Sequence, residues 1–180
     1  MSKTYSMLLA GFGGQGILFT GKVVAYAGLV DGREVSWLPS YGPEMRGGTA
    51  NCSVTISDEP IGSPLIINPE IFVAMNLPSY ERFIDNVVPD GTVIMDSTLI
   101  TEMVKRQDVK AFYIPATGLA DEKGLHGLAN MIVLGKLLRE TGFSSYDSVI
   151  TGLKKSVPPR KTELLSANIK AIELGMNYIG

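Results

Sequence analysis

The chain has 180 residues, of which 45% are hydrophobic and 19% charged, and its formal net charge is −2. This length suits one domain spanning residues 1–180, and the composition argues against wholesale disorder and against a nucleic-acid binder, which usually has a basic surplus. The single cysteine, Cys52, excludes an internal disulfide and an iron–sulfur cluster held by this chain alone. Without a signal-peptide pattern or a long uninterrupted apolar run, we expect a cytoplasmic protein with no membrane contact.

The beginning of the chain predicts a strand–loop–helix–strand unit. Residues 5–10 form an apolar run typical of a buried strand, and residues 15–30 suit a helix that is apolar on most faces. A second short strand is expected over residues 34–38, with Pro39 as its end. Units of this kind build parallel sheets.

Residues 51–57 predict a half-buried strand, because apolar and polar side chains alternate there with a period of two. The apolar positions are Cys52, Val54 and Ile56. Between this strand and the one before it lies a long polar loop.

The second half of the chain continues the alternation of strands and helices. We expect strands over 71–75, 92–95 and 110–114, and helices over 78–87, 128–140, 146–155 and 161–179. Pro78 suits a first helical turn, Pro115 should end a strand, and Gly142 should end a helix. The apolar stripe of the last helix is Leu165, Ile169, Ile172, Met176 and Ile179. The predicted fold is α/β with three layers, α/β/α, around a Rossmann-like, mostly parallel sheet.

The stretch GFGGQGILFTGK, residues 11–22, nearly fits two nucleotide-binding patterns. A triphosphate loop needs a hydroxyl after Lys22, where this chain has Val23. A dinucleotide site needs an acid at the end of the second strand, which the segment 37–40 lacks. Two interpretations stay open: glycines that allow a tight turn and close packing, or an anion site at a helix N-terminus. The candidate binding residues are Gly11, Gly13, Gly14, Gln15 and Gly16.

A second glycine-rich loop, SYGPEMRGG at residues 40–48, follows the second strand. Loops after the carboxyl ends of strands are where α/β proteins place their sites, so we expect it beside the first loop. Its candidate binding residues are Ser40, Tyr41, Gly42, Glu44, Arg46, Gly47 and Gly48. We predict no catalytic residue and no metal ligand, since no suitable cluster can be argued from spacing, and a lone histidine such as His126 is more often structural.

Together the two loops resemble the gamma subunit of 2-oxoacid:ferredoxin oxidoreductases. The resemblance rests on GFGGQGILFTGKVVAYAG and WLPSYGPEMRGGTANCSVTIS, and on the later segments SPLI (63–66), FVAMN (72–76) and DST (96–98). It covers most of the chain, and the GPEMRGGTANC version is most similar to the 2-oxoglutarate branch. It implies the fold of domain III of pyruvate:ferredoxin oxidoreductase.

Enzymes of this family oxidatively decarboxylate a 2-oxoacid, coenzyme A takes the acyl group, and ferredoxin takes two electrons. The resemblance implies alpha, beta and ferredoxin-like delta subunits as partners, which would hold thiamine diphosphate, Mg²⁺ and the iron–sulfur clusters. It implies that this chain binds no cofactor firmly and is inactive by itself. We expect both loops to face the alpha and beta subunits near the path of coenzyme A.

Two alternatives are set against this prediction. The chain would be a free-standing Rossmann-like enzyme if, in isolation, it bound NAD or FAD. It would be an assembly scaffold without a ligand if both loops contacted only protein.

Overall fold

The computed structural model describes residues 2–40 and 49–180. The strands of the described chain are β1 (Thr4–Phe12), β2 (Glu34–Ser40), β3 (Thr49–Ser57), β4 (Ile71–Ala74), β5 (Thr92–Asp96) and β6 (Lys110–Ile114). The helices are α1 (Ile17–Val30), α2 (Leu77–Phe83), α3 (Ala116–Glu122), α4 (Ala129–Thr141), α5 (Tyr146–Ser156) and α6 (Leu165–Asn177), with the short 3-10 helices η1 (Ile84–Asn86) and η2 (Pro159–Leu164). Every predicted strand and helix is present, with shifted ends.

The strands form one six-stranded sheet in the order β2-β3-β1-β4-β5-β6. The pairs β1–β4, β4–β5 and β5–β6 are parallel, so the prediction of a mostly parallel sheet is confirmed. β3 is antiparallel to both β1 and β2 and lies between them. The first strand–helix–strand unit therefore does not build two adjacent parallel strands, because β3 fills the space between its two strands.

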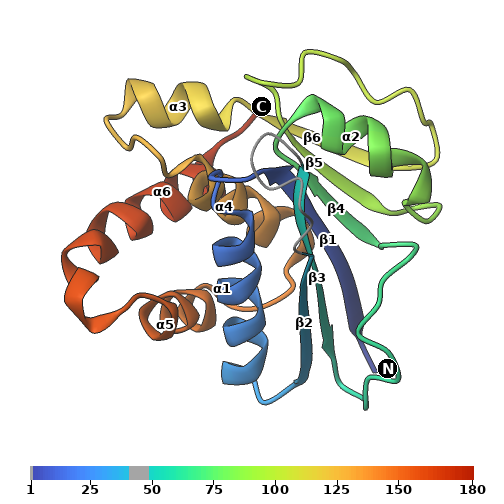
Figure 1. Cartoon of the computed structure of the whole chain (residues 1–180), viewed down its shortest axis with the longest axis horizontal. Coiled ribbons are helices and arrows are strands. Elements are labelled where there is room, and N and C mark those ends of the chain that lie inside the picture. Colours follow the sequence, from blue (N-terminus) through green and yellow to red (C-terminus); the bar gives the residue numbers. More distant parts are fainter. Residues whose placement is uncertain (1, 41–48) are drawn as a thin grey trace.

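The sheet is the middle one of three layers (Figure 1). Helices α1, α4, α5 and α6 cover one face, where their apolar side chains pack with Met7, Leu9 and Val54. The shorter α2 covers part of the other face, where Tyr80 and Ile84 pack with Phe72. The predicted three-layer α/β/α arrangement is confirmed. None of the helices in the described ranges is long and apolar enough to cross a membrane.

Among the shifted boundaries, those of β2 and α6 have a clear physical reason, and one helix was not predicted. β2 continues through Pro39 to Ser40, because a terminal strand tolerates a residue without an N–H on its unpaired side. Pro115 does end β6, but α3 begins directly after it without the long apolar periodicity that predicts a helix. In the last helix, Ile172 is buried but Ile179 is 85% exposed, because α6 ends at Asn177.

β3 is buried on both faces, so the half-buried expectation is wrong. Cys52, Val54 and Ile56 are fully buried as predicted, but Ser53 and Thr55 are each only 7% exposed. The connection from β3 to β4 passes beside this hydroxyl-bearing face (Figure 1). A strand lying second from the edge of the sheet is thus covered on both sides although its sequence alternates.

Helices α4 and α6 cross in close contact. A Cβ added to Gly135 in α4 would clash with the backbone oxygen of Ile172 in α6. Only a glycine permits this approach, because a real Cβ never comes so near a backbone oxygen. Gly142 then ends α4 in the left-handed conformation, with φ of 56°, as the sequence predicts.

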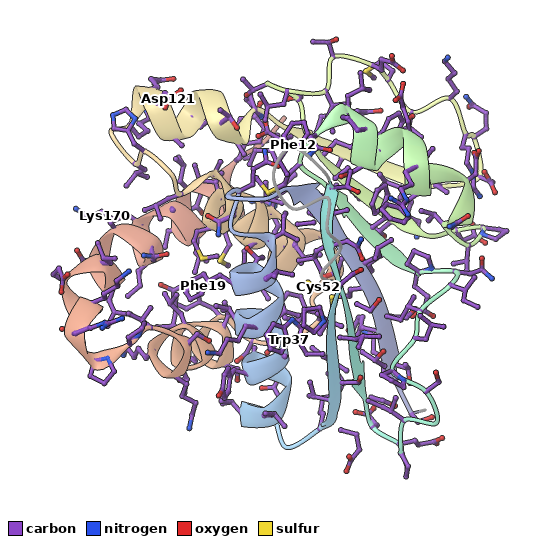
Figure 2. The ribbon with its side chains drawn as sticks, viewed as in Figure 1. Phe12, Phe19, Trp37, Cys52, Asp121 and Lys170 are labelled. Atoms are coloured by element: carbon purple, nitrogen blue, oxygen red, sulfur yellow. The ribbon has the colours of Figure 1, made fainter. Side chains whose placement is uncertain are left out.

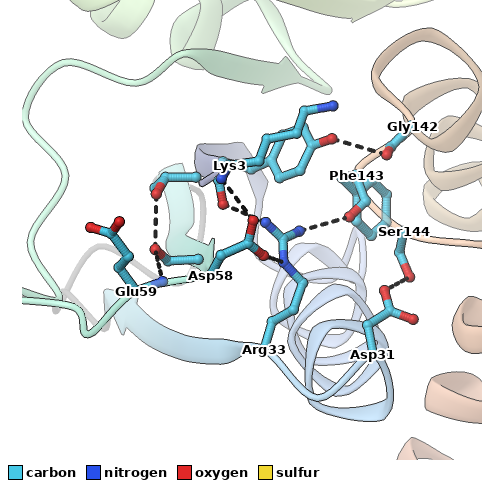
Figure 3. Close-up of polar contacts among 11 residues, drawn as sticks. Lys3, Asp31, Arg33, Asp58, Glu59, Gly142, Phe143 and Ser144 are labelled. Carbon is cyan, nitrogen blue, oxygen red and sulfur yellow. Dashed lines mark hydrogen bonds and ion pairs between the residues drawn. The ribbon is translucent and has the colours of Figure 1, made fainter. Parts of the chain in front are cut away.

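A polar network ties the chain together at the edge of the sheet where β1 begins (Figure 3). The Arg33 Nε donates to Asp58 Oδ1 at 2.7 Å, and its Nη1 reaches the Phe143 carbonyl oxygen at 3.4 Å. The backbone N–H of Lys3 donates to Asp58 Oδ2 at 2.7 Å. The hydrogen bonds from the Lys3 N–H and from Arg33 hold the pKa of Asp58 below its ordinary value.

Candidate binding site at the carboxyl edge of the sheet

The first glycine loop carries the chain from the end of β1 at Phe12 to the start of α1 at Ile17. Gly16 stands at the N-cap of α1 with φ of 78°, in the left-handed region. A Cβ there would clash with the Nδ2 atom of Asn130. That amide donates to the Gly16 carbonyl oxygen and to Thr20 Oγ1, each at 3.2 Å. Gly16 is therefore required both by its backbone conformation and by the approach of α4.

Gln15 joins the ends of two neighbouring strands. Its Oε1 accepts a hydrogen bond from the Phe12 backbone N–H at 2.6 Å, and its Nε2 donates to the Met75 carbonyl oxygen at 2.9 Å. A Cβ on Gly11 would lie 2.6 Å from the same Oε1 atom. Gly11, Gln15 and Gly16 thus have roles in packing, which favours the first of the two interpretations left open by the sequence.

The tip of this loop, residues 12–14, is nevertheless accessible to another molecule. Phe12, Gly13 and Gly14 are exposed, and the Phe12 side chain lies at the end of the sheet (Figure 2). Within residues 2–40 and 49–180 no side chain caps the N-terminus of α1, and its first turn contains no acidic residue. Backbone N–H groups at such a helix end favour anions, so the local chemistry also suits a phosphate or a carboxylate.

The second glycine-rich loop begins at the same edge of the sheet. Ser40, at the end of β2, is exposed and pairs with Asn51 in β3, which in turn pairs with Ala10 in β1. Two strand spacings, about 10 Å, therefore separate Ser40 from β1. The two loops do not follow adjacent strands, since β3 lies between β1 and β2. The other predicted residues, Tyr41, Gly42, Glu44, Arg46, Gly47 and Gly48, lie outside the described residues.

Asn76 and Ser79 are two polar residues at this edge that were not predicted. Asn76 directly follows the β4–Met75 segment, and its Oδ1 accepts from the Ser79 backbone N–H at 2.8 Å, which caps α2. Both residues are buried, and the Asn76 Nδ2 and Ser79 Oγ atoms have no hydrogen-bond partner among the residues that the structure describes. The asparagine before Leu77-Pro78 is a helix-start signal that could have predicted this cap.

A groove of about 490 Å³ opens on the hydroxyl-bearing face of the sheet. Its volume lies within the range of small-molecule sites. It brings together Ser40, the Arg82 guanidinium from α2 and apolar side chains from the connection before β4. The lining residues are Leu8, Leu38, Pro39, Ser40, Asn51, Ser53, Leu65, Ile66, Ile67, Arg82, Phe83 and Asn86.

The DST segment has a structural role. The Asp96 carboxylate, fully buried at the end of β5, accepts from the Thr117 backbone N–H at 3.1 Å. Thr98 Oγ1 accepts from the Gly118 N–H at 3.0 Å. These oxygens satisfy N–H groups in the first turn of α3 and so hold that helix at the sheet edge.

His126 is an exposed residue on the surface, where its Nδ1 atom lies 3.1 Å from Asp121 Oδ1. Figure 2 shows Asp121 on α3. Among the residues that the structure describes, no three or more His, Cys, Asp or Glu side chains are grouped to hold a metal ion.

A mostly parallel sheet between two helical layers, with a glycine loop after its first strand, defines a Rossmann-like α/β protein. Residues 6–178 match the model of the family described as pyruvate ferredoxin/flavodoxin oxidoreductase, and the chain belongs to this family. The resemblance found in the two glycine-rich loops is thereby confirmed.

Two curated relatives differ in how much of their length this chain covers. The chain is 37% identical over 172 residues to the ketoisovalerate oxidoreductase subunit VorA of Methanothermobacter thermautotrophicus, covering 94% of this chain but only 35% of that protein. It is 38% identical over 178 residues to the 2-oxoglutarate synthase subunit KorC of Methanothermobacter marburgensis, covering 95% and 94% respectively. The chain thus spans about a third of the first relative and nearly all of the second.

Solved structures show the same two lengths. The gamma subunit of a keto/oxoacid ferredoxin oxidoreductase from Geobacter sulfurreducens superposes with a TM-score of 0.81 at 25% identity, covering 95% of each chain. The 2-oxoglutarate:ferredoxin oxidoreductase of Magnetococcus marinus, solved with 2-oxoglutarate, coenzyme A and succinyl-CoA bound, superposes with a TM-score of 0.87 at 27% identity. This superposition covers 97% of this chain and 30% of the Magnetococcus marinus chain.

Proposed function

We propose that this chain is the gamma-type subunit of a 2-oxoacid:ferredoxin oxidoreductase of the 2-oxoglutarate type. The observation that carries the proposal is its similarity to KorC, a subunit of 2-oxoglutarate synthase, over nearly the whole length of both chains. The similarity to a solved gamma subunit supports the same role. We also propose a cytoplasmic location for the enzyme.

In this proposal the whole enzyme oxidatively decarboxylates the 2-oxoacid, transfers the acyl group to coenzyme A and passes two electrons to ferredoxin. We assign thiamine diphosphate, Mg²⁺ and the iron–sulfur clusters to alpha, beta and ferredoxin-like delta subunits. The single cysteine of this chain is consistent with that division, because a cluster needs several thiolates. This chain then completes the assembly and binds no cofactor firmly by itself.

We propose further that the carboxyl edge of the sheet faces the partners near coenzyme A. The α1 N-terminus, which no described side chain caps, supports this, because phosphate groups bind well to such helix ends. The groove lined by Ser40 and Arg82 supplies a cation on the neighbouring face. Gly13, Gly14 and Arg46 are the further candidates for contact with coenzyme A or with a partner.

Reconstitution tests the proposed function. This chain is combined with its co-expressed partner subunits, and acyl-CoA formation is measured on 2-oxoglutarate, pyruvate and 2-oxoisovalerate with ferredoxin as acceptor. We expect activity with 2-oxoglutarate only when this chain is present. Equal activity without it would contradict the proposal, and a preference for another 2-oxoacid would contradict the substrate.

The position near coenzyme A is tested by Arg46→Ala in the same complex. Loss of a charge-assisted hydrogen bond should raise the Michaelis constant for coenzyme A, or weaken assembly, by about tenfold or more. Arg160→Ala, which removes an exposed arginine from η2, serves as the matched control and should change neither quantity. If Arg46→Ala leaves both quantities as in the wild type, Arg46 contacts neither coenzyme A nor a partner.

A further inference from the structure

The outer edge of β2 is open. β2 stands at the end of the strand order and pairs with β3 on one side, and within the described ranges no strand pairs with its other side. Exposed strand edges present unpaired N–H and C=O groups and readily accept another strand, so proteins usually protect them. The seven residues from Glu34 to Ser40 carry one charge, at Glu34, and one proline, Pro39, so only the two ends of the strand are protected.

Pro39 shows which residues of β2 direct their backbone polar groups to the open edge. A proline inside a sheet directs its nitrogen away from the paired strand, because it has no N–H to donate. In an antiparallel pair, alternate residues direct both backbone polar groups to the same side. The backbone N–H and C=O groups of Val35 and Trp37 then face the open edge, as does the carbonyl of Pro39. The edge offers two N–H donors and three carbonyl acceptors to an additional strand.

Apolar side chains are exposed on both faces of this strand. Trp37 is 37% exposed on the α1 side, where Figure 2 shows it beside the helix, and Leu38 is 38% exposed on the opposite face. A hollow of about 240 Å³ lies between β2 and α1. It is lined by Lys22, Ala25, Tyr26, Leu29, Val35 and Trp37. On the other face, Leu38 borders the 490 Å³ groove together with Leu65 and Ile67, which are 61% and 65% exposed.

We propose that the open edge of β2 receives an extended segment of a partner subunit as a seventh strand of the sheet. Successive side chains of an added strand point to opposite faces, so one would enter the hollow beside Trp37 and the next would cover Leu38. The fitting segment carries large apolar side chains at these alternate positions. An acidic residue near the first of them would complement Lys22.

The partner is the subunit equivalent to the remainder of the longer relatives. In VorA and in the Magnetococcus marinus chain, the region similar to this protein makes up about a third of a longer polypeptide. In KorC it makes up nearly the whole subunit. A separate subunit must hold its neighbour by non-covalent contacts, and a strand pair flanked by apolar hollows supplies both hydrogen bonds and buried apolar area. This inference rests on the proposed function.

Hydrogen exchange and assembly test the proposal together. Amide exchange across residues 34–40 is measured in this chain alone and in the complex with its co-expressed partners. We expect exchange at Val35 and Trp37 to slow by about tenfold or more in the complex.

Trp37→Lys and Leu38→Lys should each weaken assembly by about tenfold or more, because each removes an apolar anchor from the interface. Met103→Lys, at a side chain that is 65% exposed elsewhere, is the control and should assemble normally.

Circular dichroism of each isolated variant verifies folding. If Trp37→Lys does not fold, the assembly of Leu38→Lys decides the test. Unchanged exchange together with normal assembly of the lysine variants overturns the strand addition and leaves the proposed function standing. Concentration-dependent protection of residues 34–40 in the isolated chain overturns it in favour of a second copy at this edge. If the wild-type chain forms no complex, both the proposed function and this inference fail.

Discussion

At the scale of single residues, Cys52 illustrates how burial controls chemistry. Its side chain is fully buried between β3 and α1, where its thiol donates to the Ile17 carbonyl oxygen at a sulfur–oxygen distance of 3.7 Å (Figure 2). Loss of solvation disfavours the thiolate and raises the pKa of Cys52 to about 12. The thiolate is the reactive form, so this cysteine is chemically inert in the folded chain.

Alkylation measures that inertness directly. In the folded chain at pH 8, iodoacetamide should modify Cys52 about a hundredfold more slowly than in guanidinium chloride, since both the thiolate fraction and access to it are low. Because the chain has one cysteine, the added mass reports on this site alone. Equal rates in both solvents would mean that the thiol is accessible in the native state.

At the scale of secondary-structure elements, the crossing of α4 and α6 depends on the absence of a side chain at Gly135. Gly135→Ala adds a Cβ against the backbone of Ile172, so the helices must move apart. We expect a loss of about 1–3 kcal/mol in the free energy of unfolding, despite the better helix propensity of alanine. Urea unfolding followed by circular dichroism measures it.

Gly62→Ala is the matched control for this prediction, because an added Cβ there meets nothing within 4 Å. It should leave the unfolding midpoint nearly unchanged. If Gly135→Ala were as stable as the control, the two helices would not cross as closely as the structure indicates.

Elements also differ in how predictable they are from sequence. All six strands were predicted, because short apolar or alternating runs between turn residues are a local signal. α3 was missed because only seven residues form it, and it is held by caps from Asp96 and Thr98 about twenty residues earlier. The burial of Ser53 and Thr55 was missed because it depends on the path that the connection from β3 to β4 takes over the sheet.

At the scale of the whole molecule, the sheet is protected unevenly. Helices cover most of one face, except at the hollow between α1 and β2, whereas the hydroxyl-bearing face of β3 and β2 is covered by the connection before β4 and borders a groove. Exposed apolar side chains on β2 and around its two hollows include Leu29, Trp37, Leu38, Leu65 and Ile67. Exposed apolar side chains gathered on one element suit an interaction site, in agreement with the proposed role as a subunit.

The site was only partly predictable, because its contacts join residues that are far apart in the chain. Gly11 and Gly16 were predicted from the glycine spacing, but their partners, Gln15 Oε1 and the Asn130 amide, emerge only when the fold is known. Asn130 lies more than a hundred residues from Gly16 in the chain, and no local pattern connects them. The predicted contact of the loop with a ligand or a partner stays a prediction.

The sequence by itself determined the family, the three-layer α/β class and the position of nearly every element, because these depend on local periodicity and on two distinctive glycine-rich loops. Only the tertiary structure decided that β3 enters between β1 and β2, and that β2 is left with an open edge. Strand order depends on which distant segments pair and which faces they bury together, and no local stretch of sequence contains that information.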